Sequence, residues 1–134
     1  MKALNILVLA SGNGTNFQSL IDSQENILPI NVVGLITDKE DCYSLKRAKK
    51  NKIPHRILVN NYNSREEYDN ELLKLIREFN FDLIVLAGWM RIITNTIIQN
   101  VNEIINIHPA LPGKYPGTNA IQRAYNNSDK ETGV

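Results

Sequence analysis

Two polar residues that can carry proton chemistry lie two positions apart near the end of an apolar run. Half of residues 103–108 are isoleucine, and the segment reads as a short, buried strand that Pro109 ends. Side chains alternate along a strand, so Asn106 and His108 point to the same face. A neutral imidazole exchanges a proton near pH 7, and an amide can hold a carbonyl oxygen in place. Asn106 and His108 are therefore candidate catalytic residues, and the alternative is a hydrogen-bonded pair at a strand end.

A glycine-rich turn, residues 12–16, follows an apolar first strand and precedes a predicted helix. Amide groups at a helix N-terminus carry partial positive charge and suit a phosphate. Gly14 lets the backbone come close to phosphate oxygens, while Thr15 and Asn16 add side-chain donors. Phe17 stands where the dinucleotide fingerprint has its third glycine, which favours one phosphate over a pyrophosphate. The alternative is a tight turn that binds no ligand.

Two further segments could face a ligand. Arg65 lies in the first turn of a predicted helix, where the helix dipole disfavours a cation, so the anionic group of a ligand could require it. Met90, Arg91, Ile92 and Ile93 follow a strand, and their apolar side chains and free backbone groups could line a slot for a flat aromatic ligand. The alternatives are a solvated surface arginine and a segment that packs the core.

Alternating strands and helices position these residues. Strands are predicted at 4–10, 30–37, 54–59, 81–87 and 103–108, and helices at 15–23, 42–51, from 64, near 95–100 and at 119–126. Capping boxes start two of the helices, at Thr15 and at Ser64. The helix after Ser64 carries an apolar stripe of period 3.6, made of Tyr68, Leu72, Leu73, Ile76 and Phe79. This order predicts an α/β, Rossmann-like fold, an open and mostly parallel sheet with helices on both faces.

Composition narrows the classes of function. The 134 residues suit a single domain, 1–134, and the net charge of +1 gives no reason to expect nucleic acid or an anionic membrane as partner. No apolar run reaches membrane-spanning length. The single cysteine, Cys42, excludes an internal disulfide and fits a cytoplasmic location. No Cys/His cluster has metal-ligand spacing. Residues 46–52 are strongly basic, and a solvated helix face is favoured over a nucleic-acid patch.

Three stretches together resemble one family. Residues 11–18 (SGNGTNFQ), residues 86–92 (LAGWMRI) and the Asn-x-His-Pro of residues 106–109 with KYPG at 114–117 are similar to phosphoribosylglycinamide formyltransferase, also called glycinamide ribonucleotide transformylase. The resemblance runs from Leu4 to Val134. It implies the transfer of a formyl group from 10-formyltetrahydrofolate to the amine of glycinamide ribonucleotide in de novo purine biosynthesis, without a metal.

The resemblance also implies a role for each candidate residue. Gly14, Thr15 and Asn16 would hold the ribonucleotide phosphate, and His108 would be the general acid or base. Asn106 would contact the folate and the formyl oxygen. The other folate-binding residues would be Arg65, Met90, Arg91, Ile92 and Ile93.

The sequence departs from the family pattern in two places. Residues 111–113 read Leu-Pro-Gly where the family usually has Leu-Leu-Pro. The sequence also stops at Val134, before the segment that supplies the family's catalytic aspartate, further strands and a C-terminal helix, and Asp129 is not that aspartate. The shortened sheet would leave a strand edge that could pair in a homodimer. The alternatives are another folate-dependent formyltransferase, a 10-formyltetrahydrofolate hydrolase, or a fragment that binds nucleotide or folate without catalysis.

Overall fold

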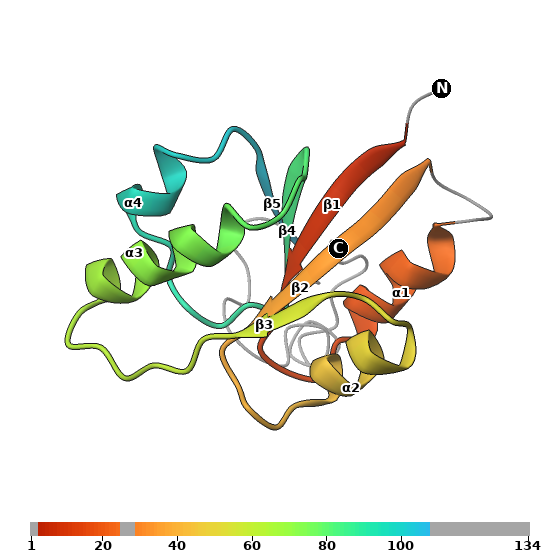
Figure 1. Cartoon of the computed structure of the whole chain (residues 1–134), viewed down its shortest axis with the longest axis horizontal. Coiled ribbons are helices and arrows are strands. Elements are labelled where there is room, and N and C mark those ends of the chain that lie inside the picture. Colours follow the sequence, from red (N-terminus) through yellow and green to blue (C-terminus); the bar gives the residue numbers. More distant parts are fainter. Residues whose placement is uncertain (1–2, 25–28, 108–134) are drawn as a thin grey trace, which may run out of the picture.

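A computed structural model of the chain describes residues 3–24 and 29–107. In these ranges strands and helices alternate as the sequence predicts (Figure 1). The strands are β1 (Leu4–Leu9), β2 (Ile30–Thr37), β3 (His55–Ile57), β4 (Leu83–Ala87) and β5 (Ile104–Ile107). The helices are α1 (Thr15–Ser23), α2 (Tyr43–Lys50), α3 (Arg65–Ile76) and α4 (Asn95–Ile98).

The strands form one parallel sheet in the order β3-β2-β1-β4-β5. The chain moves outward from β1 to β3, then returns to the other side of β1 to place β4 and β5. The loops that follow β1 and β4 therefore leave neighbouring strands in opposite directions. In open α/β sheets this switch point is where ligands bind, beyond the carboxyl ends of the strands.

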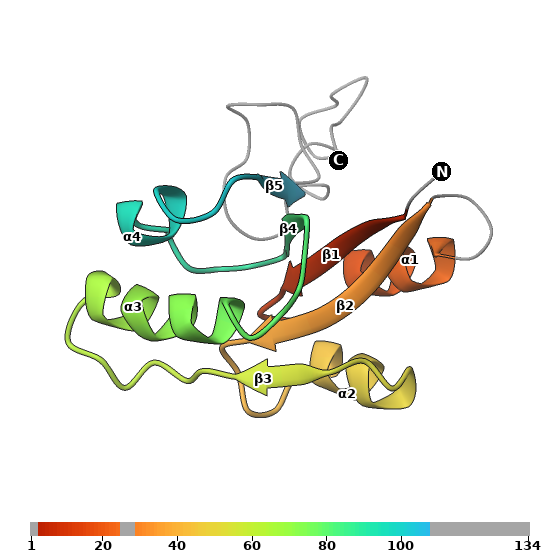
Figure 2. The same ribbon diagram turned by 45° about the horizontal axis from the view of Figure 1, so that its top comes forward.

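Helices cover both faces of the sheet, as the near-continuous apolar β4 predicts (Figures 1 and 2). Alternate residues of each central strand point to opposite faces. Ile6 and Val8 of β1 pack with Phe17 of α1 and Ala48 of α2. The other face belongs to α3 and α4, where the core contains Leu7, Leu9, Tyr68, Leu72, Ile76 and Ile97. The two cores hold the sheet rigid, so the loops at its carboxyl edge have fixed starting points.

The start of α3 confirms the capping box at Ser64. Ser64 Oγ accepts a hydrogen bond from the Glu67 backbone N–H at 3.1 Å. Glu67 Oε2 accepts one from the backbone N–H of Asn63, also at 3.1 Å, one residue earlier than in an ideal box. The predicted stripe is buried from Tyr68 to Ile76. Phe79 lies beyond the helix, where its ring packs against the same core.

Several predicted details were wrong. The N-cap of α1 is Gly14, with a left-handed φ of 78°, and no side chain caps the helix, because Thr15 already lies in the first turn. β3 covers only three of the predicted residues. β5 is not buried: among the described strands it pairs with β4 alone, and Ile105 is 52% exposed.

The predicted helix at 119–126 lies outside the described residues. No helix within residues 3–24 and 29–107 has the length and apolar character needed to span a bilayer.

Candidate functional site

The glycine turn places the start of α1 at the carboxyl edge of the sheet. Gly14 adopts φ 78°, and its carbonyl accepts the first helical hydrogen bond, from Gln18 N at 2.8 Å. The first turn of α1 contains no acidic side chain. Thr15 is exposed and Asn16 half-buried at this end of the helix. The N-terminal amides of α1 therefore lie where an anion can reach them without repulsion from a carboxylate.

Helix α2 packs directly against the turn. Ser44 donates twice to the Gly12 carbonyl, from its backbone N at 3.1 Å and from Oγ at 2.7 Å. A Cβ on Gly14 would lie only 2.5 Å from Ser44 Oγ. Position 14 therefore needs glycine both for its left-handed φ and for this close approach.

Ser11 joins the loop after β1 to the loop after β4. Its side chain is 4% exposed. Ser11 Oγ accepts a hydrogen bond from the Met90 backbone N–H at 3.0 Å, and Ser11 N donates to the Gly88 carbonyl at 3.1 Å. Two hydrogen bonds at the switch point thus connect the turn predicted to bind phosphate with the segment predicted to bind a flat ligand.

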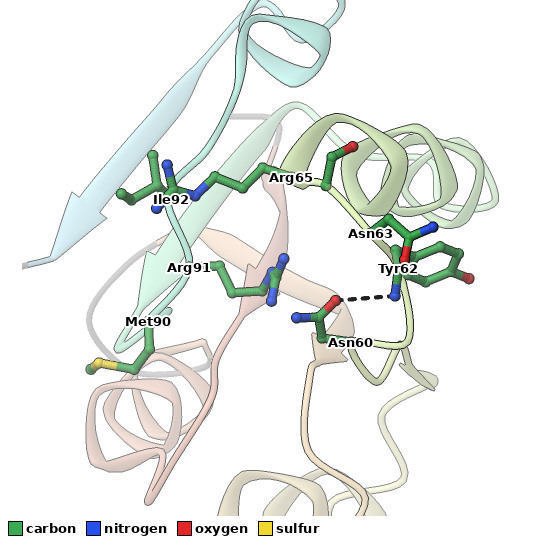
Figure 3. A pocket seen from close by; sticks show the side chains of 8 residues that line it. Asn60, Tyr62, Asn63, Arg65, Met90, Arg91 and Ile92 are labelled. Atoms are coloured by element: carbon green, nitrogen blue, oxygen red, sulfur yellow. Dashed lines mark hydrogen bonds between the residues drawn. The ribbon is translucent and has the colours of Figure 1, made fainter.

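A cavity of about 390 Å³ lies beside the second of these loops. It is lined by Asn60, Tyr62, Asn63, Ser64, Arg65, Met90, Arg91 and Ile92. In Figure 3, the side chain of Arg65 reaches across to Ile92, and that of Arg91 points toward Asn60. The two arginines come from α3 and from the β4–α4 loop, so two distant parts of the chain supply the cationic groups of one cavity.

Arg91 rests on a buried aromatic ring. Its guanidinium carbon lies 3.6 Å from the centroid of the Tyr68 ring. The ring is itself fixed, since Tyr68 OH donates to the Leu58 carbonyl at 2.6 Å. Burial, with the nearby carboxylate of Asp38 as a smaller cause, raises the pKa of the Tyr68 phenol above its ordinary value. Tyr68 is therefore a neutral platform that fixes the plane of the guanidinium.

The structure brings together most of the residues predicted to bind folate. Arg65, Met90, Arg91 and Ile92 line one cavity, and Met90 and Ile92 are 56% and 60% exposed. Ile93 does not line it and packs against the core on the α3 face.

Of the remaining predicted residues, those that the structure describes do not line that cavity. Gly14, Thr15 and Asn16 stand in the turn on the other side of the Ser11 link. Asn106 is exposed at the carboxyl end of β5, and His108 lies outside the described residues.

The sequence did not single out several residues that shape the site. Ser11, which joins the two loops, begins the SGNGTNFQ stretch but was given no role, and the cavity residues Asn60 and Tyr62 belonged to no motif. Their signal was position alone, because each follows a predicted strand at the carboxyl edge. The described residues hold no group of three or more His, Cys, Asp and Glu side chains that could bind a metal ion.

The fold and the two loops define a class: a Rossmann-like α/β domain with an anion-suited helix N-terminus and a cationic cavity at its switch point. A sequence profile described as formyl transferase matches residues 4–134, and the chain belongs to that family.

Curated relatives agree with this assignment. The phosphoribosylglycinamide formyltransferase of Dictyostelium discoideum is 45% identical over 97% of this chain and 73% of its own length. The enzyme of the same name from Escherichia coli is 38% identical over 98% of this chain and 63% of its own length. The chain thus spans about two thirds of the length of these relatives.

Solved structures have the same fold. The phosphoribosylglycinamide formyltransferase of Coxiella burnetii, solved in complex with CHES, superposes with a TM-score of 0.85 at 38% identity, over 95% of this chain and 61% of that one. Glycinamide ribonucleotide transformylase 1 of Symbiobacterium toebii gives a TM-score of 0.83 at 34% identity, over 93% of this chain and 60% of that one. The open parallel sheet predicted from the sequence is confirmed.

Proposed function

We propose that this chain belongs to an enzyme that transfers a formyl group from 10-formyltetrahydrofolate to the amine of glycinamide ribonucleotide. The observation that carries the proposal is a pair of hydrogen bonds at Ser11: Met90 N donates to Ser11 Oγ, and Ser11 N donates to the Gly88 carbonyl. These bonds connect the glycine turn to the loop that lines the cationic cavity, which supports a reaction between a phosphorylated amine and a folate. The names of the relatives support the same reaction.

The two substrates would occupy the two loops. Gly14, Thr15 and Asn16 would hold the ribonucleotide phosphate at the N-terminus of α1. Arg65 and Arg91 would pair with the folate carboxylates, while Met90 and Ile92 would supply apolar surface. Ile93, whose side chain packs against the core, would supply backbone groups only. Formyl transfer then needs the substrate amine and the formyl carbon within reacting distance between these loops.

Asn106 and His108 would act where the two substrates meet. The amine attacks the formyl carbon to give a tetrahedral intermediate, whose oxygen the Asn106 amide would stabilise. The bond from that carbon to N10 of the folate then breaks. His108 would move the proton from the attacking amine toward the leaving nitrogen. Asn106 lies near the end of β5 and pairs with Leu86 of β4, the strand that leads to the cavity loop.

Replacing His108 tests this role in the full-length natural protein. We expect His108→Ala to lower the rate of formyl transfer about 10²–10⁴-fold, the usual loss for a general acid or base. Binding of glycinamide ribonucleotide should change little, because the phosphate turn is elsewhere. The matched control is His55→Ala, since His55 lies in β3 with its Nδ1 3.1 Å from the Ile53 carbonyl. Chromatographic detection of the formylated ribonucleotide measures the rate.

Three results would contradict the proposal. Normal turnover in His108→Ala would remove the role of this histidine. Folate turnover that ignores glycinamide ribonucleotide, and that survives substitution of Thr15 and Asn16, would indicate a hydrolase or another folate-dependent formyltransferase. Saturable ligand binding without any transfer in the full-length protein would indicate a module that only binds its ligand.

The setting of the reaction is part of the proposal. We place it in the cytoplasm, where a lone thiol such as that of Cys42 stays reduced. β5 is one of the two edge strands of the described sheet, and its exposed Ile105 is where a second copy could pair in a homodimer. Sedimentation of the natural protein over a range of concentrations tests the dimer.

A further inference from the structure

One side chain of the basic segment behaves unlike its neighbours. The sequence favours a solvated helix face for residues 46–52, and Lys46, Lys49 and Lys50 are indeed exposed. Arg47 is half-buried, and its guanidinium turns toward the glycine turn instead of the solvent. The interpretation of the segment as a purely solvated face was therefore wrong at Arg47.

Each arm of the Arg47 guanidinium has a partner. Nε donates to the Asn13 carbonyl at 2.8 Å, Nη2 donates to Asn13 Oδ1 at 3.0 Å, and Nη1 donates to Gln18 Oε1 at 3.3 Å. The guanidinium carbon also lies 4.5 Å from the centroid of the Tyr43 ring. Arg47 thus links α2 to the turn and to the first helical turn of α1, and its planar group has one fixed orientation.

These bonds decide which group Asn13 can offer to a ligand. An asparagine amide has one acceptor oxygen and one NH₂ donor. Because Arg47 is donor-only, it selects the amide orientation in which Oδ1 faces the guanidinium. The Asn13 Nδ2 group then faces away from Arg47 and is free to donate. Asn13, which is exposed beside the N-terminus of α1, therefore presents its NH₂ group as a hydrogen-bond donor.

Within residues 3–24 and 29–107, no carboxylate forms an ion pair with Arg47. In the described part of the chain, the ion pairs are Arg56–Glu78 and Lys74–Glu71, and neither involves Arg47. All three hydrogen-bond acceptors of Arg47 are neutral. A half-buried cation with neutral partners leaves a positive potential beside the turn, which favours a bound anion.

The groups concerned border an open space. A cavity of about 660 Å³ beside the turn is lined by Ser11, Gly12, Asn13, Lys39, Asp41, Cys42, Tyr43 and Arg47. Asn13 and Arg47 both belong to this lining, so a ligand at the turn comes within reach of them. The lining contains two cations and one carboxylate, Asp41, which leaves a net positive charge.

We propose that Arg47 is a positioning residue of the phosphate site: it fixes Asn13 as a further hydrogen-bond donor to the phosphate and adds an uncompensated positive charge beside it. This inference rests on the proposed function, because it assigns a task to a turn that binds a phosphate monoester. It extends the site from α1 to α2, which supplied no predicted site residue.

The test measures binding of ribose 5-phosphate to the full-length natural protein by titration calorimetry. Arg47→Met should weaken binding about 30-fold, the loss of a charge-assisted arrangement worth roughly 2 kcal/mol. Arg47→Lys keeps the charge but not the planar fork, so an intermediate loss of about tenfold is expected. The matched control is Lys50→Met, which removes the same charge from the exposed face of α2 and should leave the affinity unchanged.

Two readouts separate positioning from a purely structural role. The affinity of Arg47→Met should depend less on ionic strength than that of the wild type, while Arg47→Lys should keep the dependence. Asn13→Ala should weaken binding by itself but add little to Arg47→Met, because Arg47 acts through Asn13. Binding of folic acid should be unaffected in every variant.

The outcomes are distinct. Wild-type binding of ribose 5-phosphate with an unchanged affinity in Arg47→Met and Arg47→Lys overturns this inference and leaves the proposed function standing. A lower melting temperature in Arg47→Met with unchanged affinity overturns it as well, since Arg47 would then only stabilise the fold. A full-length wild type that binds neither ribose 5-phosphate nor glycinamide ribonucleotide overturns both proposals.

Discussion

Alanine substitution at three glycines in the loops after β1 and β4 separates backbone strain from steric overlap. Gly14 has a φ of 78°, and its added Cβ would lie 2.5 Å from Ser44 Oγ and 3.0 Å from Ser44 Cα. Gly88 has a φ of 76° but open space around the added Cβ. Gly12 has open space and no left-handed φ. An alanine therefore meets both backbone strain and steric overlap at position 14, backbone strain alone at position 88, and neither at position 12.

The expected magnitudes follow from those two costs. A left-handed φ costs a non-glycine residue roughly 1–2 kcal/mol, so Gly88→Ala should lower the free energy of unfolding by about that amount. Overpacking adds typically about 1–3 kcal/mol, and Gly14→Ala should therefore lose about 2–5 kcal/mol in total. The backbone of Ser44 cannot rotate away from the new methyl group, so α2 must shift. Gly12→Ala should change stability by less than about 1 kcal/mol, or raise it slightly.

Equilibrium unfolding in urea, followed by circular dichroism, measures all three free energies on the same scale. The slope with urea should stay constant across the variants, because they expose similar surface on unfolding. If Gly14→Ala is no less stable than Gly88→Ala, the close packing of Ser44 on the turn is refuted. If both match Gly12→Ala, the assigned left-handed backbone is refuted too.

Two further sites give predictions. Asp69 is 1% exposed, and its Oδ2 accepts hydrogen bonds from Thr94 N at 2.8 Å and from Thr94 Oγ1 at 2.7 Å. Asp69→Ala should lower the free energy of unfolding by about 2–4 kcal/mol, because it leaves two donors unpaired. Urea unfolding measures this loss, and a value below about 0.5 kcal/mol would contradict the assigned bonds. Tyr68→Phe should cost about 1 kcal/mol near pH 7, because it removes the 2.6 Å bond to the Leu58 carbonyl but keeps the ring under Arg91; thermal unfolding checks it. Burial raises the pKa of Tyr68 above its ordinary 10.0, so in alkaline solution the folded state keeps a proton that the unfolded state releases. The free energy of unfolding should therefore fall as the pH rises above 10.0, and it should fall less in Tyr68→Phe. Unfolding measured at two alkaline pH values tests this difference.

The fold could be predicted from the sequence because its signals are local. The five-residue β4 lies inside a nearly continuous apolar run, and such a run is typical of a strand that helices cover on both faces. The α3 stripe repeats at the helical period, and its Ser64 cap is visible in the sequence. Where a signal was ambiguous the prediction failed: Thr15 has capping-box spacing, but the left-handed Gly14 takes the cap position.

The site was only partly predictable, because its parts meet across long stretches of sequence. Arg65 and the Met90–Ile92 segment were predicted separately, and they share a cavity because both follow strands that end at the same edge. Arg47 lies 34 residues from its partner Asn13, and nothing in a basic helix shows which cation turns inward. The pairing of Ser11 with Met90, 79 residues apart, depends on the strand order, which the residues alone do not fix.

Because β1 lies between β2 and β4, its two edges find their partner strands at different times during protein synthesis. β1 pairs with β2 through Leu4–Ile30 and neighbouring residues, so one side can close when about a quarter of the chain has emerged from the ribosome. Its other side waits for β4, whose Leu83 pairs with Ile6. Until then β1 presents a row of unpaired amides and carbonyls, a template for another chain. Asn5 and Asp82 mark the closing point, since Asn5 N donates to Asp82 Oδ2 and Asp82 N donates to the Asn5 carbonyl, both at 2.8 Å. The nascent protein is thus most prone to aggregate in the interval between translation of residues 37 and 87, when the central strand of the described sheet is still an edge.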